Sequence, residues 1–169
     1  MDELTGLLKA LRLHSSILVT GPQRSGTTIG ARVLAVELGR TYVDEDEVAV
    51  HDVARAEKVL ALGSVVLQAP GLCHVAHTFE CAVVLMRRSV DAIIRSQQRI
   101  GWGANEGGEL TKYGAASGPV AQVKYGAWDV WQKDQCTAPF ELKYEALCGH
   151  ALWVAPEQRA GFAARQWKP

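Results

Sequence analysis

Residues 16–34 read SILVTGPQRSGTTIGARVL, and this segment has three parts. Residues 17–19 form a short apolar run, which predicts a buried strand. Residues 21–26 contain two glycines and a proline, which predict a turn-rich loop. From Thr27 onward, apolar residues recur at helical spacing. A strand, a glycine-bounded loop and a helix in this order predict a site for a phosphate group.

The predicted phosphate site has a simple physical basis. The first N–H groups of a helix have no partner within the helix, and the helix dipole adds positive charge there. Gly21 and Gly26 allow the backbone to curl so that these N–H groups converge on an anion. Thr27 and Thr28 add hydroxyl groups, and Arg24 adds a positive charge with several donors.

The same residues come close to a Walker A loop, whose pattern is Gly-x-x-x-x-Gly-Lys-Ser/Thr. Thr27 stands at the position of the Walker lysine, which reaches the terminal phosphates of a nucleotide. This replacement argues against an ordinary NTPase or kinase. A degenerate phosphate loop, or a turn that binds no ligand, is the alternative that this segment leaves open.

Residues 24–28, preceded by Pro22, resemble the 5′-phosphosulfate loop of the sulfotransferases, whose pattern is Pro-(Lys/Arg)-Ser-Gly-Thr-Thr. These enzymes use the sulfuryl donor 3′-phosphoadenosine 5′-phosphosulfate (PAPS) and release its desulfated product, PAP. The resemblance implies a fold like that of the P-loop NTPases, an α/β three-layer sandwich around a mostly parallel five-stranded sheet. It also implies which residues of the loop bind the donor, namely Arg24, Ser25, Gly26, Thr27 and Thr28.

A second anion site is indicated after the fourth predicted strand. Sulfotransferases hold the 3′-phosphate of PAPS with an Arg after this strand and a Ser eight positions later, a spacing that Arg88 and Ser96 keep. Arg87 is the other candidate. The family has an Asp four positions after the Arg, and Asp91 stands at that position only if Arg87 is the anchor. Arg95 then occupies the position of the serine. We prefer Arg88 with Ser96. A pair of solvated arginines is the alternative.

Two later segments are also similar to the family. Residues 142–147 (LKYEAL) resemble its (Arg/Lys)-Tyr-Glu-Asp-Leu segment at the end of the fifth strand, with Ala146 in place of the Asp. This match indicates the register of a strand more than chemistry. Residues 159–168 are loosely similar to a segment that helps hold the 3′-phosphate, and a terminal amphipathic helix is an equally good interpretation.

The 169 residues are enough for one domain with a substantial core, and we expect residues 1–169 to form a single domain. Apolar runs predict five strands, at 17–19, 40–43, 64–68, 81–86 and 139–144. Helical spacing predicts five helices, at 2–13, 27–39, 48–62, 89–100 and 119–134. Strands that alternate with helices indicate a parallel sheet covered on both faces. Six glycines predict a long flexible loop at 101–118.

Composition limits the partners and the compartment. The formal net charge is +0, which gives no global electrostatic reason to expect nucleic acid or a membrane as a partner. No apolar run approaches the ~20 residues of a membrane helix, and the acidic N-terminus lacks the features of a secretory signal. The four cysteines lack the spacing of paired or metal-bound thiols, which predicts free thiols in a reducing compartment. We therefore expect a cytoplasmic protein.

Sulfuryl transfer requires stabilisation of the departing phosphate, donors for the sulfuryl oxygens and a base for the acceptor's proton. The resemblance assigns the first two tasks to Arg24, the loop amides and the threonine hydroxyls, without a metal ion. Family members take the base from a Glu after the second strand or a His after the third. The first position points to Glu45. No His stands in register after the third strand, although His74 and His77 follow shortly; we rank Glu45 first and His74 second, and His51 is a further candidate.

Three functions stay open from the sequence. The chain is a PAPS-dependent sulfotransferase with a small-molecule acceptor, a P-loop kinase or NTPase with a degenerate Walker A loop, or a nucleotide-binding module without catalysis. The missing lysine weakens the second function, and the lack of a secure base keeps the third open. Trp102 and Tyr113 in the glycine-rich loop could stack on a planar or sugar ring of the acceptor. Nothing in the sequence specifies the acceptor or the oligomeric state.

Overall fold

A single parallel sheet forms the centre of the protein. The computed structural model describes residues 3–48, 52–99, 125–126 and 140–153. Five strands lie in the order β2-β3-β1-β4-β5, and each neighbouring pair is parallel. The strands are β1 (Ser16–Thr20), β2 (Thr41–Val43), β3 (Val65–Gln68), β4 (Ala82–Arg87) and β5 (Phe140–Lys143). The predicted five-stranded parallel sheet is confirmed, and each strand end lies within one residue of its predicted position.

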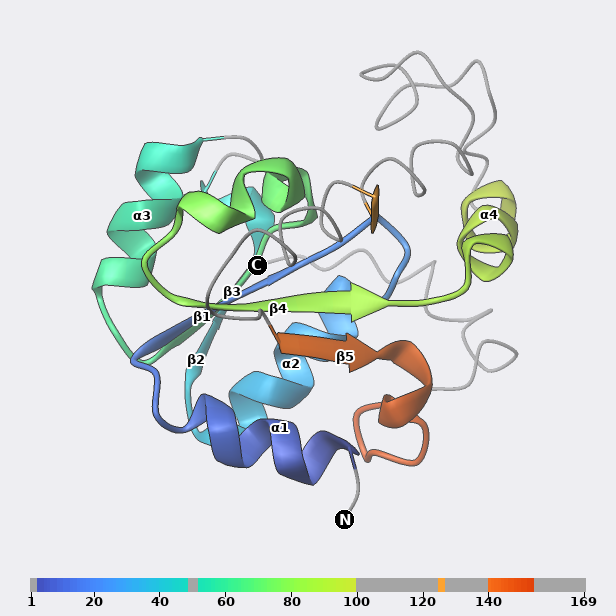
Figure 1. The fold of residues 1–169 in the computed structure, drawn as a ribbon, viewed down its shortest axis with the longest axis horizontal. Helices are drawn as coiled ribbons and strands as arrows, with labels where there is room; N and C mark the ends of the chain where they lie inside the picture. The colour runs from blue at the N-terminus through green and yellow to red at the C-terminus, as the bar shows by residue number, and fades with distance from the viewer. Residues whose placement is uncertain (1–2, 49–51, 100–124, 127–139, 154–169) are drawn as a thin grey trace.

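Helices cover both faces of this sheet, as Figure 1 shows. One face is covered by α1 (Glu3–Leu11) and α2 (Thr27–Leu38). The other face is covered by α3 (Val53–Ala61), with α4 (Val90–Arg99) joining the same hydrophobic cluster near the end of β4. Three 3₁₀ helices follow the ends of β2, β3 and β5, namely η1 (Glu45–Val48), η2 (Pro70–Thr78) and η3 (Tyr144–Leu147).

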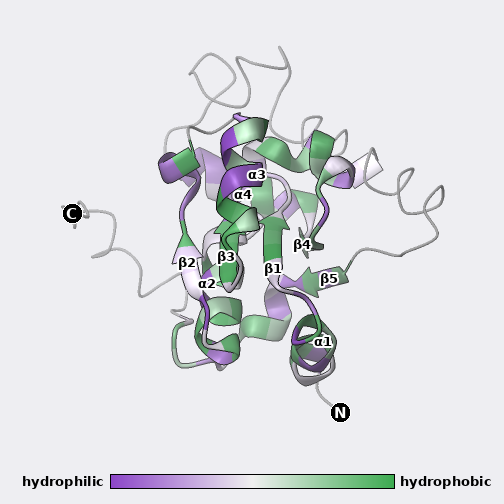
Figure 2. Cartoon of the chain, turned by 90° about the vertical axis from the view of Figure 1, so that its left-hand side faces the viewer, coloured by the Kyte–Doolittle hydropathy of each residue, from purple (hydrophilic) through white to green (hydrophobic). Residues whose placement is uncertain are grey.

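Alternate residues of the central strand β1 enter two separate hydrophobic clusters. Ile17 and Val19 pack with residues of α1 and α2, whereas Leu18 packs with residues of α3. Because β1 is buried on both faces, its three central residues are all apolar and show no hydrophobic–polar alternation. The strands at the centre of the sheet are accordingly hydrophobic in Figure 2.

A close approach between α2 and β4 depends on Gly30. A Cβ atom at Gly30 would lie 2.4 Å from Sδ of Met86, whose side chain is fully buried. Since real Cβ atoms do not approach this closely, the glycine sets the distance between the helix and the sheet. This packing fixes the start of α2 beside the end of β1.

Two segments differ from the prediction. The helix predicted at 48–62 begins only at Val53, because the Asp52 carboxylate accepts the backbone N–H of Arg55 and caps the helix there. The acidic residues before it form η1. After β3, where no helix was predicted, the chain continues as η2.

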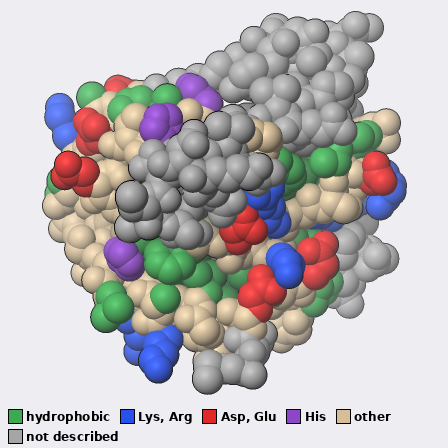
Figure 3. All heavy atoms as spheres, in the orientation of Figure 1, with side chains coloured by type: hydrophobic (Ala, Val, Ile, Leu, Met, Phe, Trp, Pro, Cys, Tyr) green, Lys and Arg blue, Asp and Glu red, His purple; other side chains and the backbone are tan. Residues whose placement is uncertain are grey.

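Several predicted features lie outside the described residues. They are the loop at 101–118, the helix at 119–134 apart from Tyr125 and Gly126, and the tail at 159–168. Within the described part of the chain, no helix has both the length and the apolar character needed to cross a membrane. Figure 3 shows acidic and basic side chains interspersed over the described part of one face.

Substituting two helical glycines tests the close approach at Gly30. Gly30→Ala gains about 1 kcal/mol of helix propensity but overpacks the Met86 contact at a cost of about 1–3 kcal/mol, so we expect a net loss of stability. Gly6→Ala in α1 is the control, because a Cβ there meets nothing within 4 Å. It should raise the free energy of unfolding by up to about 1 kcal/mol. Urea unfolding measures both changes, and equal stabilisation by the two substitutions would show that Met86 simply moves aside.

Candidate functional site

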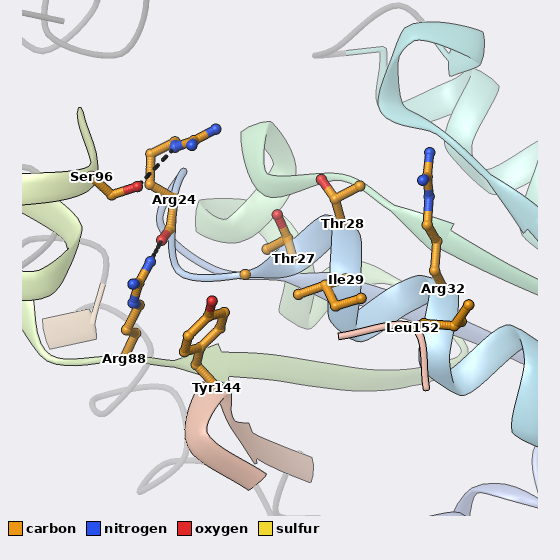
Figure 4. A pocket seen from close by; sticks show the side chains of 10 residues that line it. Arg24, Thr27, Thr28, Ile29, Arg32, Arg88, Ser96, Tyr144 and Leu152 are labelled. Atoms are coloured by element: carbon orange, nitrogen blue, oxygen red, sulfur yellow. Dashed lines mark hydrogen bonds between the residues drawn. The ribbon is translucent and has the colours of Figure 1, made fainter. Parts of the chain in front are cut away.

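A cavity of about 370 Å³ lies where β1 meets α2. The loop, the first turns of α2, the end of β4, α4 and the segment after β5 all contribute to its wall. The lining residues are Arg24, Gly26, Thr27, Thr28, Ile29, Arg32, Arg88, Ser96, Tyr144 and Leu152, and Figure 4 shows their side chains. Of the residues predicted to bind the donor, all but Ser25 line this one cavity. Ser25 is fully buried in the loop.

The loop itself adopts a backbone that few sequences can form. Arg24 has a φ of 71° and Gly26 a φ of 103°, both in the left-handed region. A Cβ atom at Gly26 would lie 2.5 Å from Cδ2 of Tyr144, so only glycine fits there. Gly26 is also the N-cap of α2 and has no side chain to cap the helix, which leaves first-turn N–H groups for an anion.

Two arginine side chains connect this loop with the end of β4 and with α4. The Nε atom of Arg24 donates to Oγ of Ser96 on α4 at 3.2 Å, and Nη1 of Arg88 donates to the carbonyl oxygen of Arg24 at 2.9 Å. The Arg88 guanidinium also lies 4.1 Å from the centre of the Tyr144 ring. Figure 4 shows Arg88 and Ser96 on the same side of the loop. Positive charge and donors are thus concentrated at one end of the cavity, although the whole chain is neutral.

The structure separates the two candidate arginines after β4. Arg87 forms an ion pair with Glu141 of β5, with Nη2 and Oε1 2.8 Å apart, and its guanidinium lies 4.7 Å from the centre of the Tyr125 ring. Arg88, but not Arg87, lines the cavity. The geometry therefore favours Arg88 over Arg87 as the anion-binding residue.

Tyr125 is a site residue that the sequence did not reveal. Its hydroxyl accepts the backbone N–H of Arg88 at 3.0 Å and donates toward the carbonyl oxygens of Met86 and Arg88, at 3.2 and 3.3 Å. Burial raises the pKa of the Tyr125 hydroxyl from 10.0 to about 12. No local motif identifies this role, because its partners are backbone groups 37 and 39 residues away in the chain. Tyr125 fixes the end of β4 from which Arg88 projects.

The candidate bases lie at the same edge of the sheet but outside the cavity wall. Glu45 is half-buried in η1, and His74 is exposed in η2. These 3₁₀ helices follow β2 and β3; β3 is the neighbour of β1 in the parallel sheet, and β2 is the next strand beyond it. His51 is outside the described residues. The structure thus brings the predicted donor-binding residues together around one cavity, and neither Glu45 nor His74 is among the residues that line it.

A polar network at the ends of β2 and β3 was also not predicted. The Tyr42 hydroxyl lies 2.5 Å from Oδ2 of Asp44 and 3.2 Å from Oε1 of Gln68. Burial, followed by the hydrogen bond to Asp44, raises the pKa of Tyr42. Arg32, which lines the cavity, places its guanidinium 5.1 Å from the Tyr42 ring centre. The network therefore joins the cavity to the acidic turn after β2.

Comparison with known proteins bears on the fold. No family model matches the chain, and no curated protein matches it. Among solved structures, shikimate kinase from Acinetobacter baumannii in complex with shikimate aligns with a TM-score of 0.50 at 17% sequence identity. The alignment covers 80% of this chain and 86% of that chain. At this identity the likeness shows the fold alone: the chain has the α/β fold of the P-loop kinases and NTPases, as its first loop predicted.

The role of Tyr125 can be tested through the pH dependence of stability. Tyr125→Phe removes the hydroxyl partner of three backbone groups and should lower the free energy of unfolding by about 1–3 kcal/mol at pH 8.

Between pH 10 and about 12 the unfolded chain loses the tyrosine proton while the folded protein keeps it, so the wild-type protein loses stability as pH rises through this window. The variant lacks this loss. In urea unfolding, the difference in the free energy of unfolding between the two proteins should therefore decrease by roughly 1.4 kcal/mol per pH unit. If this difference in the free energy of unfolding stays constant with pH, the Tyr125 hydroxyl is not buried in these hydrogen bonds.

Proposed function

We propose that this protein transfers a sulfuryl group from PAPS to the hydroxyl or amine of a small acceptor. The observation that carries the proposal is that Arg88 and Ser96 share one cavity with the phosphate loop. PAPS bears anionic groups on both the 3′ and the 5′ side of its ribose and so requires two anion sites. The helix N-terminus at Thr27 supplies one site, and the Arg88 side of the cavity supplies the other.

In this proposal each group has a separate task. Amides of the loop and the hydroxyls of Thr27 and Thr28 hold the 5′-phosphosulfate, while Arg88 and Ser96 hold the 3′-phosphate. The acceptor oxygen or nitrogen forms a bond to sulfur as the bond from sulfur to the bridging phosphate oxygen breaks. The electron pair stays on the departing phosphate of PAP, where Arg24 stabilises the charge.

The proton of the acceptor passes to a base in the same step. Glu45 is our first assignment for this base and His74 the second, because both follow strands that end at the same edge of the sheet as β1 and its loop. Neither residue lines the cavity described above. The acceptor therefore has to lie between the loop and the ends of β2 and β3, on the side opposite Arg88.

Phosphoryl transfer from a nucleoside triphosphate is the second candidate. It is favoured by the fold shared with shikimate kinase and by Thr28, at the Ser/Thr position of a Walker A loop. Two residues weigh against it. Thr27 replaces the Walker lysine, and Gln68 is a neutral amide at the end of β3, where P-loop NTPases use an Asp to hold Mg²⁺. A small acceptor and a cytoplasmic location are part of either proposal.

Calorimetry with three nucleotides distinguishes these functions. We expect PAP to bind without Mg²⁺, and AMP, which lacks the 3′-phosphate, to bind at least about 10-fold more weakly, because one charge-assisted hydrogen bond contributes about 1.5–3 kcal/mol. ATP with Mg²⁺ is the opposing probe. Tight binding of ATP–Mg²⁺ together with no binding of PAP would overturn sulfuryl transfer in favour of phosphoryl transfer.

The neighbouring arginines after β4 allow a matched test of the second anion site. Arg88→Ala should weaken PAP binding by about 10–100-fold and AMP binding by a smaller factor, since AMP has no 3′-phosphate and is affected only through the loop carbonyl that Arg88 holds. Arg87→Ala should leave PAP binding within about 2-fold and instead lower stability, because it leaves Glu141 without its ion pair. A selective loss of PAP binding in Arg87→Ala would assign the 3′-phosphate to Arg87.

A further inference from the structure

Gln97 of α4 is a buried polar residue that does not line the cavity. Its side chain is 2% exposed, and its Nε2 atom donates to the backbone carbonyl oxygen of Gln23 in the loop at 3.3 Å. Because the partner is a carbonyl, the bonded atom has to be the amide nitrogen. Its other polar atom, Oε1, is buried and makes no hydrogen bond to the described part of the chain.

Packing alone does not explain a glutamine at this position. Ile93 lies one helical turn earlier on the same side of α4 and is fully buried in the hydrophobic core. A buried amide oxygen without a donor costs free energy, and an apolar side chain of similar size would avoid that cost. The glutamine therefore has a role that the stability of the fold does not require.

The carbonyl that Gln97 holds belongs to the peptide between Gln23 and Arg24. The orientation of this peptide plane determines φ of Arg24, which has the left-handed value of 71°. A non-glycine residue is strained in that region and stays there only where its surroundings hold it. On the other side of Arg24, its carbonyl oxygen accepts from Nη1 of Arg88 at 2.9 Å. Both peptide planes that flank Arg24 are thus held from outside the loop.

We infer that Gln97 is a positioning residue of the phosphate loop. It holds the peptide between Gln23 and Arg24 so that the turn closes and the following N–H groups point at the anion. The turn is closed by the Ser25 N–H, which donates to the Pro22 carbonyl oxygen at 3.0 Å. Gln97 acts on the ligand only through this backbone. The inference rests on the proposed function in one respect, namely that the loop binds a phosphate group.

The adjacent residue provides a matched control for this inference. Gln98 is exposed on the same helix, so Gln97→Leu and Gln98→Leu introduce the same side chain one position apart. We expect Gln97→Leu to unfold at the same or a higher urea concentration than the wild-type protein. In the same variant, the Ser25 amide should exchange with deuterium at least about 10-fold faster, because the turn opens more often. PAP should bind about 10-fold more weakly, and Gln98→Leu should match the wild-type protein in exchange and binding.

Together, the measurements of stability, Ser25 amide exchange and PAP binding distinguish a positioning role of Gln97 from a packing role. If Gln97→Leu lowers stability and leaves the exchange of Ser25 unchanged, Gln97 is only a packing residue and the inference is wrong. Gln97→Met, which keeps the length of the side chain without its polar atoms, takes the place of Gln97→Leu if that variant does not fold. The exchange measurement needs no ligand. If the wild-type protein binds neither PAP nor ATP–Mg²⁺, the proposed function fails, while the exchange of Ser25 still tests the role of Gln97.

Discussion

The left-handed backbone at Arg24 is the constraint on which the candidate site depends. Side chains from Arg88 and Gln97 hold the peptide groups on either side of it. The ring of Tyr144 leaves room only for glycine at position 26, which is where α2 begins. The start of α2, and with it the direction of its first N–H groups, is therefore determined by β4, α4 and η3 rather than by the loop sequence alone.

The parallel sheet makes these distant contacts possible. All carboxyl ends of its strands meet at one edge, so residues near positions 24, 88, 97 and 144, although distant in sequence, become neighbours there. The same arrangement concentrates positive charge in a chain whose formal net charge is +0. Arg24 and Arg88 lie together at this edge and line one cavity, so the potential there depends on local charge rather than on net charge.

The fold could be predicted from the sequence because apolar runs and helical spacing are local signals. They located every strand to within one residue, although the cap at Asp52 and the 3₁₀ helix after Pro70 were missed. The loop and the pairing of Arg88 with Ser96 came from motifs. Tyr125 and Gln97 could not be found in this way. Each binds a backbone carbonyl distant in sequence, and because every residue has a carbonyl, the residue type of the partner does not reveal the contact. The assignments of Glu45 and His74 stay predictions.

A fold shared with a kinase and a loop similar to that of the sulfotransferases are compatible. In this fold the strand–loop–helix unit fixes where an anion sits, but not which nucleotide carries it. That choice depends on single residues around the loop. A lysine after Gly26 and a carboxylate at the end of β3 would suit a triphosphate with Mg²⁺. Here Thr27 and Gln68 occupy those positions, and Arg88 adds a cation on the opposite side. Thr27 thus removes a cation from the position of a triphosphate tail, Gln68 removes a carboxylate ligand for Mg²⁺, and only Arg88 adds positive charge, on the other side of the loop.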